Sequence, residues 1–198
     1  PLGGYTDGIG EPWCEDRPAA IRLIRRFLSA LAWTHRARVN VGFEFGSVQL
    51  MPAPLPRVAR ILGRGPRFDD LPDPADEEGR LALAYYREAR GTGSDFYSFL
   101  GFVKVLNLRF ENGSEQQGWI NANVDAIRHA VEIPALGIHR KAGVNIGAHL
   151  WKSGRCAIAH AYTPGRRVDP DDPSDLRQIG VDLPLMRALA EHFIEYEL

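Results

Sequence analysis

The fold is decided by residues 94–106, which read Ser94-Asp95-Phe96-Tyr97-Ser98-Phe99-Leu100-Gly101-Phe102-Val103-Lys104-Val105-Leu106. Apolar residues recur at positions 96, 99, 100, 103 and 106, the spacing that places side chains on one face of an α-helix. Ser94 or Asp95 can cap the first turn, and the pattern continues through Phe110 until Asn112-Gly113 ends it. This stretch therefore predicts a helix with one core-facing side.

Five further segments show the same helical periodicity. They are about Asp16–Arg36, with Asp16 as cap and Pro18 in the first turn; Asp76–Ala89, closed by Gly91 and Gly93; about Ser114–Val131; Val144–Tyr162; and a final helix after Pro173 that carries Leu183, Leu189 and Phe193. The helices after residue 75 are joined by mostly short turns. We therefore predict a mainly α protein whose principal domain is an antiparallel helical bundle.

The N-terminal third has a different character. Residues 38–45 alternate apolar and polar, Gly46-Ser47 offers a tight turn, and residues 48–50 can return as a second strand. Six prolines between positions 52 and 74 then exclude a long helix or a central strand. We expect two parts: residues 1–70, a small α+β appendage with one β-hairpin and a Pro-rich linker, and residues 71–198, the helical domain.

Composition excludes several classes of protein. The chain has 24 Lys and Arg against 25 Asp and Glu, a net charge of −1, so any nucleic-acid contact has to be local. No apolar run approaches the 18 residues of a membrane span, and the N-terminal residues lack a basic-then-apolar signal pattern. The two cysteines form no CxxC pair. The simplest expectation is a cytoplasmic protein with no membrane partner.

The sequence predicts no metal site and no other cofactor. It contains no GxxxxGK[ST], GxSxG or HExxH pattern. His149 and His160 share a helix face but lie about 16 Å apart along the axis, too far for one ion. His129 and His139 have no spacing that fixes their geometry. The acidic run at residues 169–175 lacks the EF-hand pattern and is expected to cap the final helix.

One segment stands out by its context, Arg155-Cys156-Ala157-Ile158-Ala159-His160-Ala161. Together with residues 85–90 (YYREAR) and 99–106 (FLGFVKVL), it resembles the HEPN superfamily, the higher eukaryote and prokaryote nucleotide-binding domains. Those are helical bundles with an Arg-x4–6-His motif in a late helix. Within that superfamily, the segment, with the DPDDP run at 169–173 and residues 182–189, is most similar to bacterial proteins labelled methylamine utilization protein MauJ. The resemblance covers residues 77–198.

The resemblance implies a specific chemistry, because many HEPN proteins are metal-independent ribonucleases that act as homodimers on RNA. His160 would deprotonate a ribose 2′-hydroxyl or protonate the leaving 5′-oxygen. Arg155 would stabilise the charge on the pentacoordinate phosphate. Asn107 and Glu111 are the polar residues available near the end of the aromatic helix, where many members carry an acidic group.

A basic cluster lies close to this motif in the sequence. Lys152, with Arg166 and Arg167 in the following turn, gives the densest positive charge near His160 and is a candidate phosphate- or RNA-binding patch. Trp151 is either a core anchor or a stacking platform for a base. Cys156 is expected to be a small core residue rather than a nucleophile.

A second interpretation stays open beside the enzyme. Arg155 can serve a structural ion pair, and His160 can be a partly buried histidine with its hydrogen bonds satisfied. The protein would then be a catalytically silent, MauJ-like accessory or interaction module with a protein partner.

Overall fold

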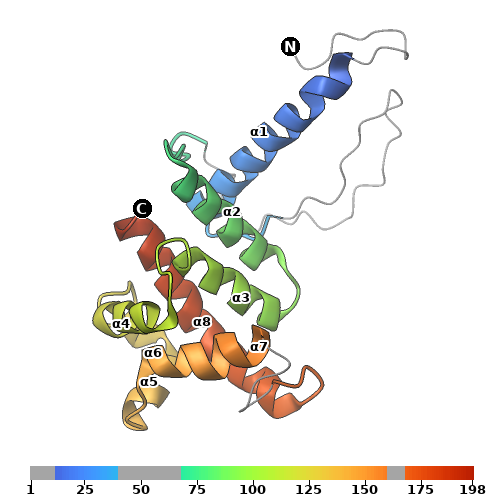
Figure 1. Cartoon of the computed structure of the whole chain (residues 1–198). Coiled ribbons are helices and arrows are strands. Elements are labelled where there is room, and N and C mark those ends of the chain that lie inside the picture. The colour runs from blue at the N-terminus through green and yellow to red at the C-terminus, as the bar shows by residue number, and fades with distance from the viewer. Residues whose placement is uncertain (1–11, 40–67, 160–167) are drawn as a thin grey trace.

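The computed structural model describes residues 12–39, 68–159 and 168–198, and these are mainly helical (Figure 1). The mainly α class is therefore confirmed. No strand occurs in the described part of the chain, so the predicted hairpin has no support; most of it, and most of the Pro-rich segment, lies outside that part. The domain boundary near residue 70 stays a prediction.

The helices follow one another along the chain, and the connections between residues 77 and 159 are short. They are α1 (Pro12–Thr34), α2 (Glu77–Gly91), α3 (Asp95–Leu106), α4 (Gly113–Asn123), the 3-10 turn η1 (Ala130–Glu132), α5 (Pro134–Lys141), α6 (Ile146–His149), the π-helical η2 (Leu150–Cys156), α7 (Ala157–Ala159) and α8 (Pro173–Tyr196). No helix within the described ranges is long and apolar enough to cross a membrane.

Side-chain caps fix the starts of four described helices, α2, α4, α6 and α8. The Asp76 carboxylate accepts a hydrogen bond from the Gly79 amide at 2.6 Å, and the Asp172 carboxylate accepts one from the Ser174 amide at 2.7 Å. These contacts confirm the predicted starts of α2 and α8. Asn112 caps α4 instead of ending the preceding helix. The α3 helix stops earlier than predicted, at Leu106.

Two other predicted boundaries are wrong. The first helix begins at Pro12, a residue whose missing N–H costs nothing in a first turn, so Asp16 lies inside the helix and does not cap it. The single helix predicted for residues 114–131 is interrupted after Asn123. His129 has a left-handed backbone, with φ of 57°, which no α-helix accommodates.

The core forms where α3 packs against both α2 and α8 (Figure 1). The largest side chains that are completely buried come from these three helices and from α4, α5 and η2: Tyr86, Phe99, Phe102, Leu106, Ile120, Leu136, Leu150, Ile179, Leu185, Met186, Leu189 and Phe193. The predicted core face of α3 is therefore correct at Phe96, Phe99, Val103 and Leu106.

The first helix packs against α2 along its second half, where the Arg25 carbonyl accepts a hydrogen bond from Arg87 at 2.8 Å. There the ring of Trp33 meets the ring of Tyr86 edge-on, with centroids 5.2 Å apart. The N-terminal part of α1 projects away from the other helices (Figure 1). Three apolar side chains on α1 are exposed, Leu23, Ile24 and Phe27.

The predicted helix over residues 144–162 forms, but its middle is a π-helix. Gly154 lies within it and is buried against the ring of Phe99, close enough that a side-chain methyl would overlap that ring. A glycine lets the η2 backbone approach α3 this closely. The wider π turn is therefore held against the core by backbone-to-ring contact.

Replacing Gly154 by alanine should destabilise the fold by about 1–3 kcal/mol, because Phe99 is fully buried and has no room to retreat. Denaturant unfolding measures this. Gly118→Ala is the matched control: the methyl there meets nothing within 4 Å and should stabilise α4 by about 0.5–1 kcal/mol. Equal effects of the two substitutions would contradict the packing described for η2.

Candidate functional site

The motif arginine lies at the end of the π-helical segment. Arg155 is half-buried, and its guanidinium carbon lies 4.6 Å from the centroid of the Trp151 ring, a cation–π arrangement. Lys152, on the same segment, is exposed. π-Helical turns inside helices frequently occur at functional sites, so η2 is a candidate site.

The remaining residues predicted from the sequence are not gathered around Arg155 by any described contact. His160, Arg166 and Arg167 lie outside the described residues. Asn107 is the C-cap of α3, and its side-chain oxygen accepts a hydrogen bond from Gln116 Nε2 at 2.8 Å, which joins α3 to α4. Glu111 is exposed in the connection between those helices.

A second site, which sequence reasoning missed, is a buried aspartate held by two histidines. Asp182 is 1% exposed and lies in the middle of α8. Its Oδ1 is 2.7 Å from His139 Nε2, and its Oδ2 is 2.8 Å from His149 Nε2. The two imidazole rings lie 4.3 Å apart, centroid to centroid. We call these three residues the His–Asp–His cluster.

The three residues of this cluster come from different elements. His139 is in the last turn of α5, His149 ends α6 immediately before η2, and Asp182 is on α8. Each histidine must present an Nε2–H to its own carboxylate oxygen for both bonds to form. One potential ligand atom from each residue lies within 4.8 Å of the others, so the same groups could hold a metal ion.

The sequence did contain a signal for this cluster. Asp182 occupies a position three residues from Ile179 and from Leu185, both of which are fully buried, so the apolar stripe of α8 carries one carboxylate. A buried carboxylate needs a hydrogen-bonding or charged partner. Local spacing could not identify His139 and His149, because the pairing depends on how α5 and α6 pack on α8.

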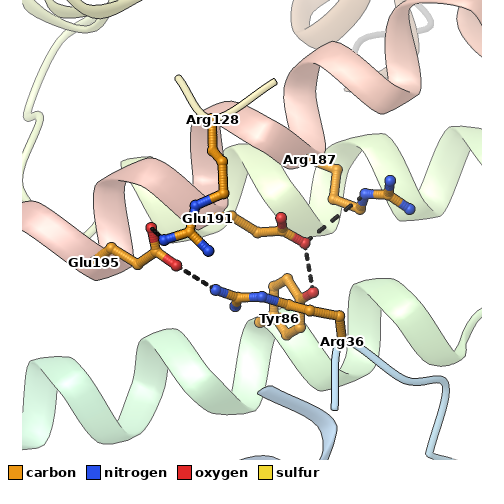
Figure 2. Close-up of polar contacts among 6 residues, drawn as sticks. All are labelled: Arg36, Tyr86, Arg128, Arg187, Glu191 and Glu195. Atoms are coloured by element: carbon orange, nitrogen blue, oxygen red, sulfur yellow. Dashed lines mark hydrogen bonds and ion pairs between the residues drawn. The ribbon is translucent and has the colours of Figure 1, made fainter. Parts of the chain in front are cut away.

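A third polar group lies further along α8 (Figure 2). Glu195 pairs with Arg36 at 2.5 Å and with Arg128 at 3.5 Å. One turn earlier, the Glu191 carboxylate accepts a hydrogen bond from the Tyr86 hydroxyl at 2.6 Å, with Arg187 Nε 3.8 Å from the same oxygen. These contacts attach the residues just after α1, and the middle of α2, to α8.

Comparison with known proteins gives one match. A family model described as methylamine utilization protein MauJ matches residues 82–195, more than half of the chain, and this span includes the His–Asp–His cluster and Arg155. Searches of curated proteins and of solved structures find no match.

The surroundings of Tyr86, which include the Glu191 carboxylate on α8, change the acidity of the Tyr86 hydroxyl. Burial raises the pKa of the Tyr86 hydroxyl well above its usual value of 10, and the nearby Glu191 carboxylate raises this pKa further. Above pH 10 the unfolded chain ionises this hydroxyl while the folded chain keeps it protonated. Tyr86 therefore lowers the free energy of unfolding as the pH rises through that range, by up to about 1.4 kcal/mol per pH unit.

Replacing Tyr86 by phenylalanine should cost about 1.5 kcal/mol at pH 8, because Glu191 loses a charge-assisted hydrogen bond. The difference from the wild type should shrink between pH 10 and pH 11, since the variant has no Tyr86 proton to lose. Urea unfolding at both pH values measures this. Tyr97→Phe, at an exposed site, is the control; a difference that stays constant for Tyr86→Phe would refute the argument.

Proposed function

Since the chain belongs to the methylamine utilization protein MauJ family, a name that specifies no reaction, we propose its function from the chemistry of its side chains. We propose a HEPN-like, cytoplasmic homodimer that binds RNA or a nucleotide at η2. Its reaction would be metal-independent cleavage of RNA by Arg155 and His160.

The observation that carries this proposal is the guanidinium of Arg155 over the face of Trp151 at 4.6 Å. An arginine offers a planar fork of donors that matches two phosphate oxygens, and stacking on an aromatic ring holds that fork in one orientation. Lys152, exposed on the same segment, adds a second positive charge. An arginine held by an aromatic ring, with a second cation on the same segment, suits the binding of phosphate groups.

The chemical step needs a proton acceptor near neutral pH and a group that stabilises a dianionic phosphorane. His160, five residues after Arg155, supplies the first, because an imidazole exchanges protons near pH 6.5. Arg155 supplies the second. Attack of the ribose 2′-oxygen on phosphorus breaks the bond to the 5′-oxygen, and the proton moves from the first oxygen to the second through imidazole. Arg166 and Arg167 would bind flanking phosphates.

The second candidate function is a catalytically silent interaction module, and the exposed apolar side chains of α1 favour it. Leu23, Ile24 and Phe27 are 68, 53 and 44% exposed. Phe27 stacks on the exposed Phe68 with ring centroids 6.1 Å apart. Apolar surface of this kind suits a protein partner, and the family name suggests a partner connected with methylamine utilization.

The two candidates differ in one assay, the cleavage of a mixed RNA pool in excess EDTA. The enzyme should cleave RNA, and Arg155→Ala and His160→Ala should each slow cleavage by about 10²- to 10⁴-fold. Arg109→Ala, which removes an exposed arginine paired with Glu78, and His129→Ala, which removes an exposed histidine, are the matched controls.

Circular dichroism shows whether each variant is folded, and sedimentation velocity gives the mass of the assembly. Absence of cleavage by folded wild-type protein, or equal cleavage by wild type and both motif variants, would eliminate the ribonuclease and favour the interaction module.

A further inference from the structure

We propose that the His–Asp–His cluster is a binding site for a divalent transition-metal ion of the zinc type, with His139, His149 and Asp182 as its ligands. The sequence alone predicts no such site, and the proposed ribonuclease chemistry does not use one. The proposal rests on the geometry of three side chains that α5, α6 and α8 bring together.

The ligand set fits the chemistry of such an ion. Two imidazole nitrogens and one carboxylate oxygen are the donors that zinc and its neighbours in the first transition row accept. Their ligand atoms all lie within 4.8 Å of one another. Three protein ligands leave a coordination position for water or an exogenous ligand, as in metal sites that are not purely structural.

The distances require only a small rearrangement. The two nitrogen-to-oxygen separations are 2.7 and 2.8 Å. Metal–ligand bonds of about 2.0–2.2 Å in tetrahedral geometry separate neighbouring ligand atoms by about 3.3–3.5 Å. Each nitrogen–oxygen pair therefore has to open by about 0.5–0.8 Å, a change on the scale of a side-chain rotation.

Charge and access favour the same interpretation. Asp182 is a buried carboxylate, and a divalent cation would take the place of the two Nε2 protons that now face it. The side chains of His139 and His149 keep 11% and 16% exposure, so the cluster is not completely enclosed. Arg140, next to His139, is paired with Asp125, which offsets its positive charge.

The site would also act on the segment that carries Arg155. His149 is the residue immediately before η2, which begins at Leu150. An ion bound to His149 and Asp182 would therefore fix the start of η2 against α8. The hydrogen bond between His149 and Asp182 already joins these two residues without an ion. Removal of the ion with EDTA leaves this contact in place, so cleavage of RNA in EDTA tests the ribonuclease separately from the ion.

Metal binding by the full chain tests the proposal directly. Protein freed of metal with EDTA and then desalted is titrated with zinc chloride by calorimetry and with cobalt chloride by visible absorption. We expect one equivalent per chain, a rise in the melting temperature with zinc, and a cobalt spectrum with nitrogen and oxygen ligands only.

Asp182→Asn keeps the shape of the side chain, and His149→Gln removes one nitrogen ligand; each should weaken zinc binding at least about 100-fold. His129→Gln removes a histidine that also lies beside a carboxylate but is exposed, and it should bind zinc like the wild type. If Asp182→Asn does not fold, the zinc affinity of His149→Gln and the cobalt spectrum of the wild-type protein test the proposal.

Three results would overturn the proposal. They are the absence of stoichiometric zinc binding by folded wild-type protein, zinc affinity that is unchanged in Asp182→Asn or His149→Gln, and a thiolate-to-cobalt charge-transfer band, which would assign the ion to a cysteine. The cluster would then be a hydrogen-bonded bridge between helices, and the ribonuclease proposal would stand or fall independently.

Discussion

The structure depends on the pairing of carboxylates along one helix, α8. This helix packs against α2, α3 and α5, and it carries Asp182, Glu191 and Glu195 on or beside its packed surface. A carboxylate removed from water is costly unless another group neutralises or hydrogen-bonds it. Each of the three is matched by side chains from elsewhere in the chain. The pairing of α8 therefore helps to determine where the other helices dock.

The carboxylates of α8 lie in two regions of the helix, which differ in the type of side chain that pairs with them. Near its middle, the buried Asp182 carboxylate contacts two imidazoles. Towards its C-terminus, guanidinium groups with permanent charge lie beside the carboxylates (Figure 2). The guanidinium carbon of Arg36 also lies 3.3 Å from the centroid of the Trp33 ring. The middle region offers imidazole and carboxylate groups, and the C-terminal region attaches the segment that follows α1.

Sequence patterns predicted the helix boundaries that depend on neighbouring residues. They did not predict features that depend on contacts between residues far apart in the sequence. Asp76 and Asp172 cap the helices they were expected to cap, because capping involves residues two or three positions away. The π turn around Gly154 depends on Phe99, 55 positions earlier, and the His–Asp–His cluster joins residues 33 and 43 positions apart. Arg155 was identified by its resemblance to a motif, and its contact with Trp151 required the structure.

The position of α8 in the chain has a consequence for synthesis on the ribosome. Residues 77–159 emerge before α8. They include Tyr86, Phe99 and Leu106, which are buried in a core that α8 completes. Until α8 emerges, that apolar surface and the histidines of α5 and α6 have no partner. The core can therefore close only after α8 has been translated, and the nascent domain exposes this apolar surface until then.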